Sequence, residues 1–316
     1  PPMSSVRPGE FEEMDSVLIT VMNYGSDYLD MWVEMLDVYR QAGHTYIVIE
    51  PELESTMTSR FESAGIPATA YTYLGYAHDS IWMRDYGPEF VYTPLGERQI
   101  IDADYGSSRP NDDAIPLVVA DDTWINADDS AMTAWSHAHG LAGGNIMTDG
   151  NGTCFFSHII YGYEAPSGWS QQDVDDMLAD YYGCEQIVTL NPICLDQTGH
   201  IDLYAKAMGP RSILLGEYPS DTHFDGSTYS WFNTGHCGSN YPNDYQDQED
   251  NLATLEAITD MDGEPYTITR VPMPEPYPDG WSWVYRSYLN SQVFNDYVAM
   301  PSYYDPQAES AEDLLD

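Results

Sequence analysis

The chain has 316 residues, of which 42% are hydrophobic, and carries a formal net charge of −42. Its length suits one large α/β domain or two smaller ones, and no stretch approaches the ~18–20 apolar residues of a membrane-spanning helix. Such a charge repels nucleic acid and anionic membranes and attracts cations, so we expect a cationic ligand and neither of those partners. Because the acidic residues are spread along the chain, they indicate a hydrated surface suited to high salt.

Strands and helices are expected to alternate from the N-terminus onward. The first expected elements are, in chain order, strand 16–22, helix 27–43, strand 45–50, and a further helix before segment 66–73. Gly43 marks the end of the first helix. Later, Ser170 as an N-cap, Asp173 three residues on and Gly183 as a stop predict another helix. This alternation indicates an α/β fold, and the absence of a clear linker predicts that residues 1–316 form a single domain.

A weak internal repeat organises the rest of the chain. Each copy starts with a polar cluster, turns at Gly, Pro, Asn or Asp residues, and continues as an apolar strand, so each predicts a hairpin. The copies are segments 80–92, 142–157, 198–218 and 288–303. Hairpins placed around one axis would bring their first strands together at the centre. The polar residues expected to converge there are Asp85, Asn145, His200, Asp202 and Asn290.

His200 and Asp202 form the sharpest pair in this set. They are two residues apart on an expected strand, so both side chains would point to one face. A histidine can act as acid and base near neutral pH, and a carboxylate can hold a cation. The alternative is a hydrogen-bonded pair in the core, just as Arg84 and Asp85 could be a structural ion pair. The repeated position of these residues in the hairpins favours a site.

Four cysteines, Cys154, Cys184, Cys194 and Cys237, allow three pairings, among which the sequence does not choose. No CxxC pair is present, so we do not expect a zinc site. We expect no cofactor of another kind. Cys154 lies in the apolar run TCFFS and is interpreted as a core thiol. The chain begins at Pro1 without an initiator methionine or a signal peptide, which suggests a trimmed or processed protein, and we expect an extracellular location.

Motifs in the same order resemble one known family. They are WMRDYGP, GGNIMTDGNGT, TGHIDLYAK, VPMPEP and YLNS. Together they are similar to those of the Porphyromonas-type peptidylarginine deiminases and the related agmatine deiminases, and RPNDDAIP (109–116) leans toward the peptidylarginine branch. The resemblance runs from about Leu18 to Tyr303. It implies a five-fold pseudosymmetric α/β propeller around a central site, here with the fifth unit incomplete.

The resemblance also implies a reaction, the hydrolysis of a guanidino group to a ureido group and ammonia. By motif, Asp85 and Asp202 hold the substrate guanidinium through paired hydrogen bonds. A cysteine thiolate attacks the guanidinium carbon to give a thiouronium intermediate, and His200 protonates the departing ammonia and then activates water. Asn290 matches a position that lines the substrate site, and Trp82 is expected to pack against the guanidinium or its alkyl stem. The reaction needs no metal. Peptidyl-arginine, free arginine and agmatine all remain open as substrates.

The sequence departs from the family pattern at two places. Peptidylarginine members have two arginines before PNDD that bind the carboxylate of a C-terminal arginine, whereas here Arg109 follows Ser107 and Ser108. The family nucleophile lies in a GG-x-x-H-C motif near the C-terminus, and this sequence stops at AESAEDLLD, before that motif. Cys237, in TGHCGSN, echoes the motif only superficially, and Cys194 is interpreted as a loop or strand-end thiol.

Three hypotheses follow. In the first, the chain is a deiminase whose cysteine segment is absent from this sequence or supplied by a separate chain or a neighbouring subunit. In the second, it is a non-catalytic relative used in binding or assembly, as an oligomer or filament. In the third, it binds arginine-like cations without reaction. We favour the first, because the guanidinium-binding and acid/base residues are all present. We also expect the flank between hairpin 288–303 and strand 16–22 to be covered, with the tail 305–316 along that gap.

Overall fold

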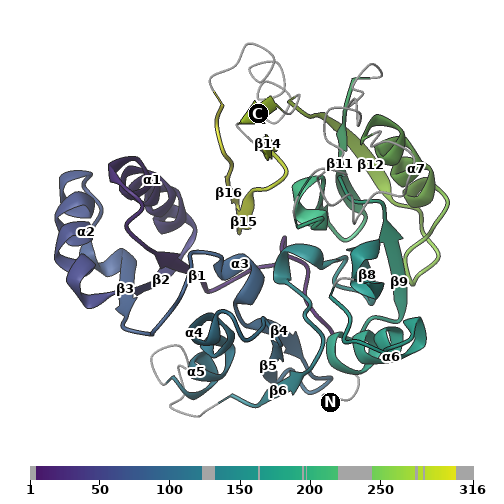
Figure 1. The fold of residues 1–316 in the computed structure, drawn as a ribbon, viewed down its shortest axis with the longest axis horizontal. Coiled ribbons are helices and arrows are strands. Elements are labelled where there is room, and N and C mark those ends of the chain that lie inside the picture. Colours follow the sequence, from purple (N-terminus) through teal and green to yellow (C-terminus); the bar gives the residue numbers. More distant parts are fainter. Residues whose placement is uncertain are drawn as a thin grey trace.

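The structure is a computed structural model that describes residues 5–122, 132–162, 164–193, 196, 198–219, 244–274, 277–279 and 282–303. Within these residues, four three-stranded sheets and a C-terminal hairpin lie around a central axis, down which Figure 1 looks. The fold is an α/β propeller, as the resemblance predicts. No helix in the described part of the chain is long and apolar enough to cross a membrane.

The elements, in chain order, are β1 (Ser16–Val21), α1 (Ser26–Ala42), β2 (His44–Ile49), α2 (Pro51–Ser63), η1 (Ala68–Ala70), β3 (Tyr71–Leu74), α3 (Met83–Tyr86), β4 (Glu89–Tyr92), β5 (Arg98–Ala103), α4 (Pro110–Asp113), α5 (Ile115–Asp121), β6 (Ala134–His137), η2 (Gly143–Asn145), β7 (Met147–Thr148), β8 (Thr153–Ser157), η3 (His158–Tyr161), α6 (Gln171–Tyr182), β9 (Gln186–Leu190), η4 (Ile201–Leu203), β10 (Ala205–Gly209), β11 (Ser212–Glu217), α7 (Asp244–Glu256), β12 (Thr267–Pro272), β13 (Tyr277–Asp279), β14 (Ser282–Val284), β15 (Gln292–Phe294) and β16 (Tyr297–Ala299).

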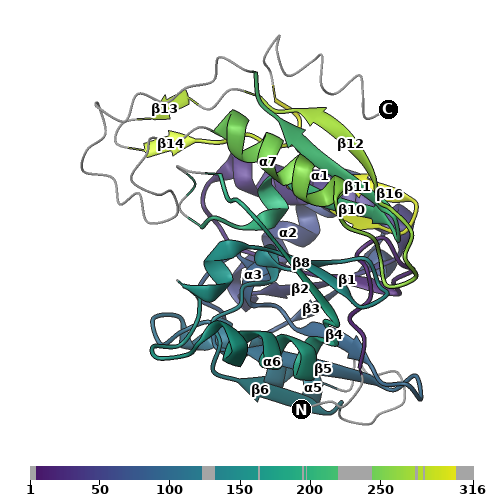
Figure 2. The same ribbon diagram turned by 90° about the vertical axis from the view of Figure 1, so that its right-hand side faces the viewer.

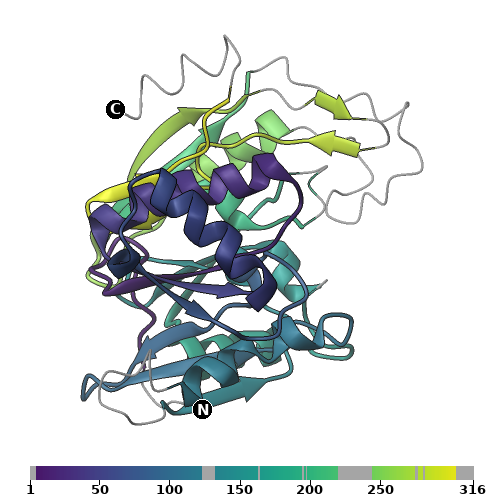
Figure 3. The same cartoon turned by 90° about the vertical axis from the view of Figure 1, so that its left-hand side faces the viewer.

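The expected N-terminal elements are confirmed to within two residues. Helix α1 ends at Gly43, and it buries Trp32 and Leu36 against its sheet, which Figure 3 shows behind α1 and α2. Helix α6 begins with the expected capping box, in which the Ser170 hydroxyl accepts from the Asp173 amide and the Asp173 carboxylate accepts from the Ser170 amide. It ends at Gly183, whose left-handed backbone suits glycine.

Three sheets share one topology. In β4-β5-β6, β7-β8-β9 and β10-β11-β12, the first strand runs antiparallel to the second, and the second pairs in parallel with the third after intervening helices. Figure 2 shows helix α7 beside its sheet. Sheet β1-β2-β3 is parallel throughout, and within the described residues β1 pairs with β2 alone. Strand β1 therefore corresponds to the second strand of the other three sheets. The antiparallel first strand that would lie beside it is not among the described residues.

Three of the four predicted hairpins are confirmed, at β7-β8, β10-β11 and β15-β16. The first one is wrong, because Arg84 and Asp85 lie in helix α3 and only the strand after Gly87 is extended. His200 and Asp202 were also expected on a strand, but Asp202 lies in the 3₁₀ turn η4 and His200 is its N-cap. Short helical turns at the start of the units, rather than strands, thus carry the polar residues.

The last hairpin packs against the first group of elements. The ring of Phe294 lies 6.2 Å from that of Tyr39 on α1, with the two rings edge to face. In the turn, the Asn295 side chain accepts from the Met14 amide at 2.8 Å and donates to the Ala42 carbonyl at 3.0 Å. The hairpin does not cover the expected flank, because within the described residues a groove lined by residues 16–20 of β1, Met300 and Ser302 lies there. The tail 305–316 lies outside the described residues.

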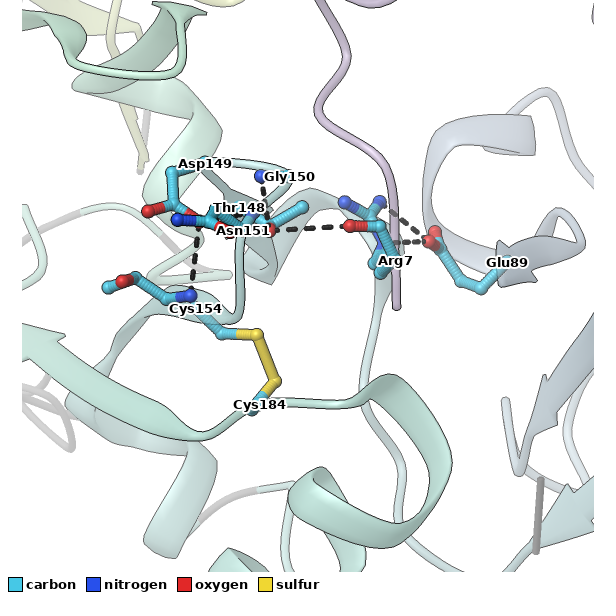
Figure 4. Close-up of a disulfide and its surroundings, with 9 residues drawn as sticks. Arg7, Glu89, Thr148, Asp149, Gly150, Asn151, Cys154 and Cys184 are labelled. Carbon is cyan, nitrogen blue, oxygen red and sulfur yellow. Dashed lines mark hydrogen bonds and ion pairs between the residues drawn. A yellow bond between two sulfur atoms is a disulfide. The ribbon is translucent and has the colours of Figure 1, made fainter. Parts of the chain in front are cut away.

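The interpretation of Cys154 as a core thiol is wrong. Cys154 is buried, but it forms a disulfide with Cys184, and Figure 4 shows the bond joining β8 to the segment after α6. The left-handed turn at Gly183 reverses the chain at the end of α6 and brings Cys184 within 5.5 Å of Cys154, Cα to Cα. Cys194 and Cys237 lie outside the described residues.

Candidate active site

Polar groups meet at the propeller axis where α3, η2 and η4 pack together. The Nδ1 atom of His200 lies 3.4 Å from Oδ1 of Asp85. Gly144, on η2, sits against both residues and against Asp202, because a Cβ atom built on it would lie 2.7 Å from Asp85 Oδ1, 2.7 Å from His200 Nδ1 and 3.1 Å from Asp202 Oδ2. The structure thus brings Asp85, His200 and Asp202 into one cluster.

A further carboxylate, which the sequence analysis missed, lies on the other side of the histidine. Glu164 Oε1 is 3.9 Å from His200 Nε2. The carboxylate is buried and accepts from Asn145 Nδ2 at 2.8 Å and from the Ala142 amide at 3.4 Å. Glu164 lies in a loop outside the repeated hairpins, so the repeat gave no signal for it. The imidazole therefore lies between two carboxylates.

Burial and mutual repulsion set the charges in this cluster. Burial acts to lower the pKa of His200, but its bond to Asp85 and the charges of Asp85, Asp202 and Glu164 raise it to about 9. Burial raises the pKa of Glu164 to about 7 against the attraction of His200. Burial, with help from Asp85, raises the pKa of Asp202 to about 6 against the attraction of His200, Arg84 and Lys206. At neutral pH the cluster therefore holds a protonated imidazole, a mainly ionised Asp202 and a Glu164 that is protonated about half of the time.

The remaining predicted site residues lie around this centre. Trp82 precedes α3 and is 51% exposed. Arg109 lies over the Tyr105 ring and donates to the hydroxyls of Tyr105 and Ser80, at 3.1 and 3.4 Å. The Tyr105 ring in turn packs edge to face on Tyr86 of α3, with the ring centres 5.5 Å apart, so Arg109 lies near the helix that carries Asp85.

The two predicted asparagines have different surroundings. Asn145 is fully buried, donates to Glu164 and accepts from the Ser157 amide at 2.9 Å, so it supports the site from behind instead of forming its wall. Asn290 is exposed at the start of the last hairpin, where its amide donates to the Ser287 hydroxyl at 3.3 Å. It lines a groove that runs along β1.

This arrangement suits the binding of a planar cation and acid/base chemistry beside it. Two aspartates from different units can accept hydrogen bonds from one guanidinium, and a protonated histidine between them and Glu164 can donate a proton. Among the described residues, no group of three or more His, Cys, Asp or Glu side chains is placed to hold a metal ion.

Gly144→Ala is expected to destabilise the protein by about 1–3 kcal/mol, because the new methyl group overlaps Asp85 and His200 and forces them apart. Urea unfolding measures the loss. Gly75→Ala is the matched control, since a Cβ atom there meets nothing within 4 Å and the change should be small. Equal losses in the two variants would contradict the close packing of the cluster around Gly144.

Residues 8–316 match the family profile described as Porphyromonas-type peptidyl-arginine deiminase. An agmatine deiminase of Pseudomonas aeruginosa is 23% identical and one of Pseudomonas syringae pv. tomato is 21% identical, each over 90% of this chain and 83% of the relative. The solved agmatine deiminase of Enterococcus faecalis superposes with a TM-score of 0.77 at 18% identity, over 99% of this chain and 87% of that one. The structural likeness shows a shared fold.

Proposed function

The chain belongs to the Porphyromonas-type peptidyl-arginine deiminase family, and on that premise we propose that it hydrolyses the guanidino group of an arginine-like cation to a ureido group and ammonia. The observation that carries this proposal is the cluster itself: Asp85, His200 and Asp202 come from separate units and meet around Gly144. Relatives named agmatine deiminase support the same class of substrate.

In the proposed reaction, the guanidinium lies between Asp85 and Asp202. A cysteine thiolate adds to the guanidinium carbon, and the C–N bond to one amino group breaks as His200 protonates that group, which leaves as ammonia. His200, now neutral, removes a proton from water as the water oxygen adds to the thiouronium carbon. The C–S bond then breaks to release the thiolate, and the added hydroxyl loses its proton to solvent, which leaves the ureido product. Glu164 holds the imidazole from the other side and favours its protonated form.

The thiolate does not come from Cys154 or Cys184, which are joined in the buried disulfide. We place it on a segment with the GG-x-x-H-C motif that lies outside this sequence and pairs antiparallel with β1. Two features support that location. In each of the three sheets that share one topology, an antiparallel strand occupies the edge that corresponds to the edge of β1 with which no described strand pairs.

The second feature is a groove of about 1930 Å³ along this edge. Residues 16–20 of β1 form one side, and Met300 and Ser302 lie on the other. The groove also reaches Arg84, next to Asp85, and Asn290. A strand lying in this groove would pair with the backbone N–H and C=O groups at that edge of β1. It would end close to the candidate active site.

Experiments on the protein purified from its native source test this function directly. Mass spectrometry of the purified protein should identify a segment with the GG-x-x-H-C motif, in the same chain or bound to it. That preparation should then release ammonia and a ureido product from agmatine, arginine or a peptide with a C-terminal arginine, and comparison of the three identifies the substrate. A preparation that contains the cysteine segment but turns over none of them would refute the proposal, and a protein without the segment that forms oligomers would favour an assembly role.

Agmatine affinity is expected to fall as the pH drops below about 6, where Asp202 takes up a proton. The raised pKa means that the folded protein holds this proton up to a higher pH than the unfolded chain, so acid removes the negative charge that the guanidinium needs. Calorimetric titration between pH 5 and 8 measures the affinity. Asp202→Asn should give weak binding at every pH, and an affinity of the unaltered protein that does not change over this range would contradict a role for Asp202 in binding.

A further inference from the structure

Behind the candidate active site, one carboxylate oxygen joins several parts of the propeller. Oε1 of Glu10, in the N-terminal segment (residues 5–15), lies 3.1 Å from Arg84 Nη2, 3.1 Å from Lys206 Nζ, 3.2 Å from Gln292 Nε2 and 3.0 Å from the Val293 amide. Its partners come from α3, β10 and β15. Burial acts to raise the pKa of Glu10, but Arg84 and Lys206 hold it at about 2, so the carboxylate stays ionised.

Lys206 is the only lysine of the chain, and its side chain is 5% exposed. Besides Glu10, its ammonium group donates to the Ser291 carbonyl at 2.6 Å. A lysine is seldom buried to this degree without a specific need for its charge, because desolvation of the ammonium group is costly. Burial accordingly lowers its pKa. In a chain with 52 acidic residues, the placement of this cation at the propeller axis calls for an explanation.

The position of Lys206 relative to the candidate active site explains why a cation is buried there. Glu10, Arg84, Lys206 and Asp202 all line a single cavity of about 20 Å³ at the axis. Asp202 thus stands between the His200 cluster on one side and two cations on the other. Its carboxylate shares the cluster with Asp85 and Glu164, and both the burial of Asp202 and the charge of Asp85 favour its neutral form.

We propose that Lys206 is a positioning residue whose ammonium group, fixed by Glu10 and the Ser291 carbonyl behind the site, keeps Asp202 ionised so that it can bind a guanidinium. The inference rests on the proposed function for the ligand of Asp202, but the shared cavity of Lys206 and Asp202 does not depend on that function. Glu10 fixes the positions of the Lys206 ammonium and the Arg84 guanidinium, since it accepts a hydrogen bond from each at 3.1 Å.

Other charged groups line the same cavity or contact the neighbours of Asp202, and a test must hold them constant. They come from its own turn, from α3, from β4, from the N-terminal segment and from the loop after η3: His200, Arg84, Asp85, Glu89, Arg7, Glu10 and Glu164. Lys206 offers the cleanest substitution among the cations, because methionine matches the length of its apolar stem and arginine keeps its charge.

The experiment is a pH titration of the Asp202 carboxyl carbon by NMR on the full chain with labelled aspartate, with the signal assigned through Asp202→Asn. Lys206→Met should move the midpoint upward, and Lys206→Arg should leave it near the value of the unaltered protein. Mere loosening of the structure would let water reach Asp202 and move the midpoint downward, so the sign separates the two explanations. Lys206→Gln, which can still donate to the Ser291 carbonyl, should also shift it upward and replaces Lys206→Met if that variant does not fold.

A midpoint that stays unchanged or falls in the folded neutral variants would overturn the proposal. Agmatine affinity at pH 7, measured on the same samples, should fall in Lys206→Met and recover in Lys206→Arg. If agmatine binds to none of the proteins while the carboxyl midpoint shifts as expected, the proposed function fails and the link between Lys206 and Asp202 stands.

Discussion

Asp85→Asn is expected to weaken agmatine binding by about 2 kcal/mol or more, roughly 30-fold, because it removes a partly buried charge that the proposed function places against the cation and preserves the side-chain shape. The same change should lower the pKa of His200 from about 9, since Asp85 is bonded to that ring and is the main group that raises it. Calorimetry measures the affinity, and NMR of the His200 ring measures the pKa.

Asp37→Asn is the matched control for this prediction. Asp37 lies on the outer side of α1, is half exposed and pairs with Arg40 one turn away, so it makes the same chemical change far from the site. Its effect on agmatine affinity should be negligible. If the two variants bind agmatine equally well, Asp85 does not contact the substrate. A His200 pKa that still falls in Asp85→Asn would then show that the cluster is structural.

Loss of the disulfide is expected to have the largest effect on stability. Replacing Cys154 and Cys184 by alanine should lower the free energy of unfolding by about 3–4 kcal/mol, because the bond closes a loop across a separation of 30 residues. The bond also joins β8 and the end of α6 inside one hydrophobic cluster, so its removal loosens the core there. Urea unfolding with and without a thiol reductant measures the change.

The double variant also serves as the control for the reductant. In the unaltered protein the reductant should move the urea midpoint downward, whereas in Cys154→Ala/Cys184→Ala it should have no effect through this pair. Any shift left in the variant belongs to Cys194 or Cys237. An unaltered protein with equal midpoints in both conditions would show that the bond does not contribute to stability.

Much of the fold could be predicted because local signals and tertiary packing agree. Helix α6 has a serine N-cap, an acidic third residue and a final glycine, and all three act within a few residues of each other. The hairpins at Asn295 and Gly209 likewise follow from turn residues between apolar runs. The assignment of Asp85 to a strand failed because the turn of helix at α3 is only four residues long, too short for a periodic pattern to appear.

The site was harder to predict from the sequence, because its residues meet at the propeller axis and have no fixed spacing along the chain. His200 and Asp202 could be found since they share one motif, and the repeat pointed to Asp85. Glu164 had no such signal, because it lies in a loop and gains its role only through a 3.9 Å approach to His200. The partnership of Cys154 with Cys184 was open for the same reason, since any pairing of the cysteines fits the sequence.

The hydrogen bonds between the N-terminal segment and the last hairpin have a consequence for folding during synthesis. Glu10 bonds Val293, and Met14 bonds Asn295, across separations of 283 and 281 residues. At ribosomal rates this delay is on the order of 15–60 s, during which the N-terminal segment has emerged without its partners. Contacts so distant in sequence form late and slowly. Until the last hairpin arrives, Glu10 lacks its bonds to Gln292 and Val293 and Lys206 lacks its bond to the Ser291 carbonyl, so chaperone dependence should be greatest in that interval.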